Sequence, residues 1–305
     1  GVCAYTSVSV VGPDLTTIKS DIGSNGTIDT SQMSQAGTYV VAGVSGKFTG
    51  KAVASSTITC NGACSGQIQG GAFPSSSGTI CSALTVPTFT PGATALNITS
   101  GYTMNSGTGY SWGNVTMPDS GSSGSCGNSY NTLSIQAGAS GTNTVVQFNT
   151  LTMGYCTRLA VLGAGNIELR IGKATLNGIT TGGYGSSPND VHFGVTSADT
   201  GSVLAPLAAG QLTVWVNSNC TPPGCACAQN PPQGQTSCAA QISHIAGSAI
   251  FNVPNGSLNY DDSCPAYGTA TAKTILFSGC AQLDASGFMS SPYTNFYNLR
   301  SWKDE

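Results

Sequence analysis

Short runs of β-branched and other apolar residues, each ended by glycine, asparagine, serine or proline, make up most of this chain. Runs of this kind are typical of β-strands, and strong helix formers are too sparse to sustain a helix in most windows. The sequence therefore predicts an all-β fold, in which only residues 291–305 have some helical character. Strands are expected at residues 6–11, 37–44, 52–60, 110–117, 131–136, 143–152, 158–162, 167–171, 211–217, 248–253 and 269–278.

Glycine and asparagine recur where one run ends and the next begins, as in residues 22–28, 41–50 and 162–172. Tight hairpin turns explain some of the Asn-Gly pairs. The stacked coils of a β-solenoid explain the whole set more simply, because each coil needs Gly or Asn where the chain turns a corner in left-handed geometry. We therefore expect one elongated, right-handed β-helix-like domain over residues 1–290, with a loop insertion at residues 218–240. No strict repeat is visible, so a β-sandwich or jelly roll is the alternative fold.

Charged side chains are unusually rare in this sequence. Lys and Arg (9) and Asp and Glu (12) make up 7 % of the 305 residues, against about 25 % in an ordinary domain. This composition fits an extracellular, β-rich surface or filament protein better than a cytoplasmic enzyme. The net charge is −3 and no basic patch could follow a phosphate backbone, so nucleic-acid binding is not expected. No apolar run approaches the length of a transmembrane helix, so no membrane-spanning segment is expected either.

The cysteines point to an oxidising compartment, because their count is even and few histidines accompany them. A four-thiolate metal site at Cys220, Cys225, Cys227 and Cys238 is the alternative to disulfides. Proximity in sequence favours pairing Cys60 with Cys64 or Cys81, Cys126 with Cys156, and Cys264 with Cys280. The disulfide candidates are Cys3, Cys60, Cys64, Cys81, Cys126, Cys156, Cys220, Cys225, Cys227, Cys238, Cys264 and Cys280.

Several sequence positions match the acceptor pattern for N-linked sugar, N-x-S/T. A chain this rich in Asn, Ser and Thr contains such matches by chance, and O-linked sugar on its loops is equally compatible with the sequence. Attached sugar would explain how so uncharged a surface stays dissolved. The glycosylation candidates are Asn25, Asn97, Asn114, Asn219 and Asn255.

No catalytic residue and no cofactor is expected. Gly109-Tyr110-Ser111-Trp112-Gly113 matches the G-x-S-x-G motif of a nucleophile elbow, which needs a strand before the serine and a helix after it. The flanking residues predict neither, so a surface turn is the interpretation.

The remaining charged and titratable residues are expected to be structural. The adjacent Asp261 and Asp262 are the candidate ligands for a calcium ion, although a turn after a strand explains them more simply. His192 and His244 are isolated in the sequence. Glu168 and Arg170 are two residues apart on one strand and are expected to form an exposed pair.

Two long stretches of the chain resemble a known group of proteins. Residues 6–71 and 131–284 contain "TIKSDIGSNGTIDT", "VVAGVSGKFTGKAVASSTITCNG", "GSAIFNVPNGSLNYDD" and "AKTILFSGCAQLDASG". These patterns resemble the glycine-rich β-helix regions found beside bacterial type IV and tight-adherence pilus proteins. The resemblance implies a β-helix in or beside a pilus-like filament. Type IV pilins begin with a long apolar helix, which this sequence does not show, so the expected role is that of a partner subunit, a sheath or a tip protein.

The last residues differ in composition from the rest of the chain, because they combine large aromatic side chains with charged ones. Such residues are enriched at interfaces, so we expect this tail, residues 291–305, to contact another subunit or to cap the last coil. The interface candidates are Tyr293, Phe296, Tyr297, Arg300 and Trp302.

The sequence therefore predicts an extracellular or cell-surface structural protein, a subunit or sheath component of a pilus-like filament or surface layer. The expected partners are further copies of the chain or another filament subunit, together with glycans. A carbohydrate-binding adhesin and a polysaccharide-degrading β-helix enzyme are the alternatives. An ice-binding solenoid would need a regular T-x-T array, which is not evident along the sequence.

Overall fold

The computed structural model contains 23 strands and one short helix, α1 (Cys64–Gln67), among the residues that it describes. Those residues are 1–11, 17–33, 47–120, 126, 130–172, 179–181, 191–201, 203–218, 238–261, 266–279 and 282–285. The pairings between these strands are all parallel. The all-β prediction is confirmed, and the parallel pairing does not fit an antiparallel jelly roll or sandwich.

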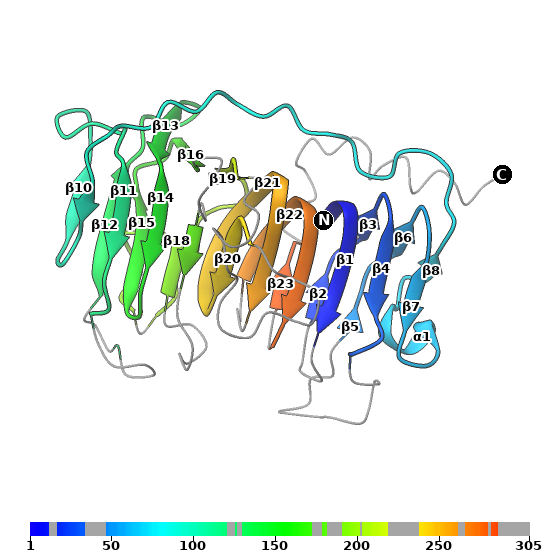
Figure 1. Cartoon of the computed structure of the whole chain (residues 1–305). Helices are drawn as coiled ribbons and strands as arrows, with labels where there is room; N and C mark the ends of the chain where they lie inside the picture. The colour runs from blue at the N-terminus through cyan, green and yellow to red at the C-terminus, as the bar shows by residue number, and fades with distance from the viewer. Residues whose placement is uncertain are drawn as a thin grey trace.

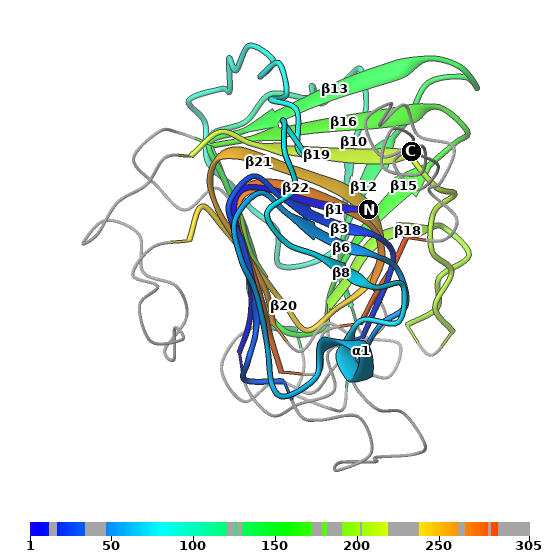
Figure 2. The same ribbon diagram turned by 90° about the vertical axis from the view of Figure 1, so that its right-hand side faces the viewer.

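The strands form three faces, which the chain visits in the same order on every turn (Figures 1 and 2). The first face contains β10 (Tyr102–Met104), β12 (Asn131–Gln136), β15 (Thr157–Leu162), β18 (Val191–Thr196), β23 (Gln282–Asp284), β2 (Thr17–Lys19) and β5 (Lys47–Phe48). The second face contains β13 (Asn143–Phe148), β16 (Asn166–Ile171), β19 (Leu212–Val216), β3 (Ile22–Ser24), β6 (Ala52–Ala54) and β8 (Ala72–Phe73). The third face contains β9 (Leu96–Asn97), β11 (Asn114–Met117), β14 (Thr150–Met153), β17 (Ile179–Thr181), β20 (Ala240–Ser243), β4 (Thr27–Thr30) and β7 (Ile58–Cys60). Three long strands bend from one face to the next: β1 (Val2–Val11), β21 (Ile245–Asp261) and β22 (Ala266–Ser278).

The chain begins in the middle of the stack of turns (Figure 1). β1 lies between β22 on one side and β3 and β4 on the other. From β1 the turns advance to one end of the stack, at β7 and β8, and residues 74–95 then cross back along the outside to the opposite end. The turns that start at β9 and β10 return from there to β22. The stack is therefore two sets of turns that meet in its middle.

The turn at which the two sets meet is built from both, and we call it the seam. On the first face, β23 lies between β22 and β2. On the second and third faces of the same turn, β1 pairs with β22 from Val2 to Val11, with one irregularity between Ala4 and Ser7. Residues 2–11 and 282–284 thus complete a single turn.

Inward-pointing side chains form continuous apolar rows through the stack. One row on the second face is entirely buried and runs through Val146, Leu169, Val214, Phe251, Ala270, Val2, Ile22 and Ala52. Because side chains alternate along a strand, each of these residues has outward-pointing neighbours. Burying an aliphatic side chain contributes about 1.5–3 kcal/mol, so each turn is stabilised mainly by the turns above and below it.

Glycine allows tight corners in two different ways. A Cβ at Gly26 would collide with the backbone carbonyl of Thr6, so this Asn-Gly corner needs glycine for the close approach of the next turn. Gly172 has a φ of +130°, a conformation that other residues rarely adopt. The expectation of left-handed corners therefore applies to Gly172, whereas close stacking explains Gly26.

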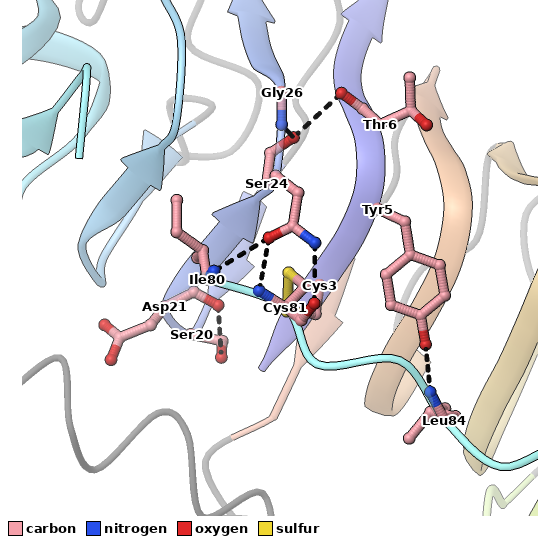
Figure 3. The surroundings of a disulfide bond; sticks show 11 residues. Cys3, Tyr5, Thr6, Ser20, Asp21, Ser24, Gly26, Ile80, Cys81 and Leu84 are labelled. Atoms are coloured by element: carbon pink, nitrogen blue, oxygen red, sulfur yellow. Dashed lines mark hydrogen bonds between the residues drawn. A yellow bond between two sulfur atoms is a disulfide. The ribbon is translucent and has the colours of Figure 1, made fainter. Parts of the chain in front are cut away.

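Residues 74–95, which we call the strap, run outside the second face and are fastened to successive turns (Figures 1 and 3). The Asn25 side-chain oxygen accepts the backbone N–H groups of Ile80 and Cys81 at 2.9 and 2.7 Å, and its NH₂ group donates to the Cys81 carbonyl at 2.8 Å. The Tyr5 hydroxyl accepts the N–H of Leu84 at 3.0 Å. Farther along, the Arg170 guanidinium donates to the Thr88 carbonyl at 2.8 Å. The strap is thus fixed to both sets of turns.

Several strand predictions differ from the structure because a corner interrupts or extends them. Residues 52–60 contain two strands, β6 and β7, and residues 143–152 contain β13 and β14. Residues 248–253 are only the middle of the 17-residue β21. Helix α1 was not predicted. It follows directly on the Cys60–Cys64 disulfide, and its buried Gln67 accepts a hydrogen bond from Thr30 at 2.9 Å.

Other predictions fall on residues that the structure does not describe. These are the strand at 37–44, residues 219–237 of the expected loop insertion, and the tail at 291–305. No helix among the described residues is long and apolar enough to span a membrane.

Candidate functional site

The third face carries two rows of polar side chains on its outer surface, near the end of the stack that contains α1. On each of these strands, the residue between two outward-pointing positions points inward: Val8 on β1, Ile28 on β4 and Ile58 on β7. The β1–β4 and β4–β7 pairings hold these strands in register. We call the outward-pointing set the polar patch: Ser7, Ser9, Thr27, Asp29, Thr57 and Thr59.

The polar patch is a regular array. Neighbouring strands lie about 4.8 Å apart, and alternate residues on one strand lie about 6.7 Å apart. Thr27, Thr57 and Thr59 are exposed, and the other three side chains are half-buried. Within the described part of the chain, the five hydroxyl groups have no hydrogen-bond partner, whereas Asp29 accepts the N–H of Ser31 at 2.9 Å. The hydroxyl groups are therefore available to a ligand.

In the middle of the same face, the row that continues from Ser9 is buried at Leu276, Asn259 and Gln241, whereas Ser257 and Thr274 in the other row are half-buried. Gln241 and Asn259 are only 2 % and 4 % exposed although they lie on the outward side of β20 and β21. Asn259 donates to the side-chain oxygen of Gln241 at 3.0 Å, and the hydroxyls of Ser257 and Thr274 are 2.6 Å apart. The rows thus continue along the face, and their fully exposed members lie toward the ends of the stack. At the far end they continue at Asn97, Asn114, Thr116, Thr150 and Thr152.

A cluster of titratable side chains lies on the outside of the first face. His192 on β18 contacts the Asp199 carboxylate at 2.9 Å from Nδ1, and its Nε2 lies 3.4 Å from the Tyr130 hydroxyl. Arg158 on β15 lies 3.3 Å from the same carboxylate and stacks over the Tyr130 ring. The carboxylate also accepts the N–H groups of Gly201 and Ala205 at 3.0 and 3.2 Å.

The Asp199 carboxylate has no exposed surface, and the His192 side chain is 5 % exposed. Burial alone would raise the pKa of the Asp199 carboxyl. Its interactions with His192 and with two backbone N–H groups outweigh burial and lower this pKa from its ordinary value of 3.8. Because the partners of the carboxylate all lie within the protein, the cluster holds Asp199, Gly201 and Ala205 against the first face. The structural role expected for His192 therefore suits its surroundings, and His244 is likewise buried, at the corner between β20 and β21.

Three disulfides connect described cysteines. Cys60 pairs with Cys64, which selects one of the two partners that sequence proximity favoured, and Cys126 pairs with Cys156. Cys3 pairs with Cys81, so the strap is joined covalently to β1 (Figure 3). This corrects the alternative pairing of Cys60 with Cys81. Cys238 is also disulfide-bonded, whereas Cys220, Cys225, Cys227, Cys264 and Cys280 lie outside the described residues.

The glycosylation candidates have different surroundings. The Asn25 side-chain amide is fully used in holding the strap. Asn97 and Asn114 are exposed on the third face, and Asn255 is exposed with its amide 3.1 Å from the side-chain oxygen of Asn217. Asn219 lies outside the described residues.

The other sequence candidates do not assemble into a reactive centre among the described residues. Ser111 donates to the Thr90 carbonyl at 3.2 Å, and the strand β11 follows it instead of the helix that a nucleophile elbow requires. Asp261 accepts the Ser278 hydroxyl at 2.7 Å, its neighbour Asp262 is not described, and no group of metal ligands is found in the described part of the chain. Glu168 and Arg170 form the expected pair at 2.7 Å, but the pair is half-buried and not exposed as predicted.

Both ends of the stack leave part of the apolar core uncovered. Ile58, Cys60, Cys64 and Ala72 are partly buried at one end, and Leu96, Tyr102, Tyr110 and Trp112 at the other. These side chains are continuous with the core of the stack. The rings of Tyr102 and Trp112 meet edge to face at 6.1 Å. Among the described strands, β7 and β8 pair only on their inner side, as do β9 and β10.

Comparison of the chain with protein-family models, with curated proteins and with solved structures gives no match. The resemblance to pilus-associated regions therefore stays a prediction. Two features of the structure bear on function, the ends of the stack and its polar rows.

Proposed function

We propose that this chain is an extracellular structural protein, a right-handed β-helix whose copies join end to end in a pilus-like filament or surface layer. The observation that carries the proposal is the partly exposed apolar core at both ends of the stack. In the rest of the stack, each turn buries its apolar residues against two neighbours. An end-to-end contact would supply the missing neighbour at each end.

The direction of the strands suits this kind of contact. Because the strands are parallel throughout, a second copy displaced along the stack axis presents its strands in the same sense. β7 of one copy would then face β9 of the next on the third face. The backbone groups left unpaired on the outer side of these strands would gain partners. Such a head-to-tail contact joins two different surfaces and therefore builds an open filament and not a closed dimer.

The extracellular setting is supported by the disulfides and by the composition. Three disulfides in the described residues need an oxidising environment to persist. A surface with few like charges offers little electrostatic repulsion between identical copies. Self-association is the partner prediction that these features favour. The interface candidates of the tail, Tyr293 to Trp302, lie outside the described residues and add no support.

The experiment compares assembly of the wild-type protein with that of variants charged at one end. Ala72→Lys at one end and Leu96→Lys at the other place an ammonium group in the proposed contact. Ser134→Lys on the side of the stack is the matched control. We expect wild type and the control to form filaments in electron micrographs and species of growing mass in light scattering as concentration rises. Both end variants should remain monomers with unchanged circular dichroism. A wild-type protein that stays monomeric, or end variants that assemble normally, would refute the proposal.

A further inference from the structure

We propose that the polar patch is a binding site for an extended, neutral polysaccharide whose chain lies along the stack axis. This inference concerns the side of the molecule and is independent of the end-to-end contact proposed above. It starts from the regular register of β1, β4 and β7 on the third face.

The chemistry of the patch matches sugar hydroxyl groups. Each Ser or Thr hydroxyl can donate one hydrogen bond and accept others, and the Asp29 carboxylate accepts. In the described structure the hydroxyl groups of Ser7, Ser9, Thr27, Thr57 and Thr59 have no protein partner. A polymer with hydroxyl groups on every unit can bond to several of them at once.

The charge of the patch selects among polymers. Asp29 is its only charged residue, and it carries a negative charge. An anionic polysaccharide would meet that charge at close range without a cation in the patch to balance it. A neutral polymer has no such penalty.

The middle of the third face shows that these rows can be covered. There, Gln241 and Asn259 occupy the same outward row and are buried with their side chains hydrogen-bonded to one another. The row positions of β1, β4 and β7 have equivalent geometry, but three of them are exposed and the other three are only half-buried. The polar patch is therefore the more exposed continuation of a row that is buried in the middle of the third face.

A polysaccharide explains the patch better than an ice surface does. Thr57 and Thr59 form one T-x-T pair, and the neighbouring strand places Thr27 and Asp29 beside them. The fourth position of this group is Asp29, however, and an ionised carboxylate holds water too strongly to fit a neutral lattice. Retention by ice is accordingly an outcome that counts against the proposal.

The test measures depletion of the protein from solution by microcrystalline cellulose and by chitin, with cross-linked pectate as the anionic comparison. The protein carries Ala72→Lys, so that end-to-end contacts do not add avidity. The test variant is Thr27→Val/Thr57→Val/Thr59→Val, which removes hydroxyl groups but keeps β-branched shapes. Thr103→Val, at an exposed threonine on β10 of the first face, is the matched control.

We expect binding to at least one neutral polymer, a loss of about tenfold or more in affinity for the triple variant, and less than about twofold for Thr103→Val. Circular dichroism should show that all three proteins are folded. The proposal is wrong if neither neutral polymer binds, if pectate binds more tightly, or if the triple variant binds as well as the parent. It is also wrong if the parent protein is retained by growing ice and by no polysaccharide. A positive result with monomeric protein supports the patch even if the filament proposal fails.

Discussion

At the scale of single residues, the Asp199 carboxylate is a buried charged group whose replacement is expected to be costly. It is fully buried and interacts with His192, Arg158 and two backbone N–H groups. Removing the carboxylate leaves its partners buried without the charge that they bind. The free energy lost in this way exceeds the net stabilisation that an intact buried ion pair provides.

We predict that Asp199→Asn lowers the free energy of unfolding by about 3 kcal/mol at neutral pH. The folded protein lowers the pKa of this carboxyl below 3.8, so the stabilisation is present above that value and is lost as pH falls through the lower, folded pKa. The stability difference between wild type and variant should therefore shrink below about pH 4. Urea titrations at a series of pH values would measure it. Asp119→Asn, an exposed carboxylate, is the control, and a difference that does not change with pH would contradict this account.

The sequons give a second prediction at this scale. If the protein is produced in a host that attaches N-linked sugar, Asn97 and Asn114 should be modified and Asn25 should not. The Asn25 amide is held in three hydrogen bonds to the strap, whereas Asn97 and Asn114 are exposed. Glycopeptide mass spectrometry would locate the sugars. Sugar on Asn25 of the folded protein would show that the strap is not fastened as described.

At the scale of elements, the strap is joined to β1 by the disulfide that closes the longest loop among those between described cysteines. The Cys3–Cys81 disulfide closes a loop with a sequence separation of 78, whereas Cys60–Cys64 spans 4. A cross-link stabilises the folded state mainly by restricting the unfolded chain, and more so for a longer loop.

We predict that Cys3→Ser/Cys81→Ser destabilises the protein by about 4.5 kcal/mol and Cys60→Ser/Cys64→Ser by about 1.9 kcal/mol on the chain-entropy model. Differential scanning calorimetry of the two double variants would show directly which of them is less stable. Equal losses in the free energy of unfolding would mean that loop length does not determine how much each disulfide stabilises the protein, and that native-state strain or contacts do.

The sequence predicts the strands of this protein much better than their arrangement. Residues 131–136 form a strand in which buried Leu133 and Ile135 alternate with polar side chains, and alternation is a local property. The polar rows are not visible in the sequence because the turns differ in length. Residue 7 pairs with residue 27, but residue 28 pairs with residue 58, so no fixed period aligns Ser7, Thr27 and Thr57. The repeated polar–apolar–polar triplets at 7–9, 27–29 and 57–59 were the only local signal of the patch.

The contacts of the strap also could not be predicted from the sequence. Asn25 looks like an Asn-Gly corner with a sequon, and nothing local shows that Cys81 lies beside it. Cys3 had no predicted partner for the same reason. Long-range pairing of this kind depends on where the chain returns, which composition and spacing do not contain.

At the scale of the whole molecule, the seam makes the protein a complex of two parts of one chain. The first part ends with the strap and the second begins at the opposite end of the stack (Figure 1). They pair along β1 and β22 and along β2 and β23. Every cysteine before residue 85 is bonded to another in that same range, so no disulfide links the two parts.

We predict that the protein survives a cut in the strap. A protease site in place of residues 85–87, where the structure shows no hydrogen bond, should be cleaved without loss of the fold, because the seam holds both parts by parallel strand pairing. The two fragments should elute together in size-exclusion chromatography and separate in urea without reductant. As a control, the wild-type protein without the added site should not be cleaved. Fragments that separate in buffer would show that the strap, and not the seam, holds the parts together.

The position of β1 also affects how the protein is made. β1 is synthesised before its partner strand β22, with the other turns made in between. Until β22 is made, β1 has a bare edge, the kind of surface on which nascent chains aggregate. The turn that contains β22 covers that edge, so a polypeptide truncated before β22 would leave it open.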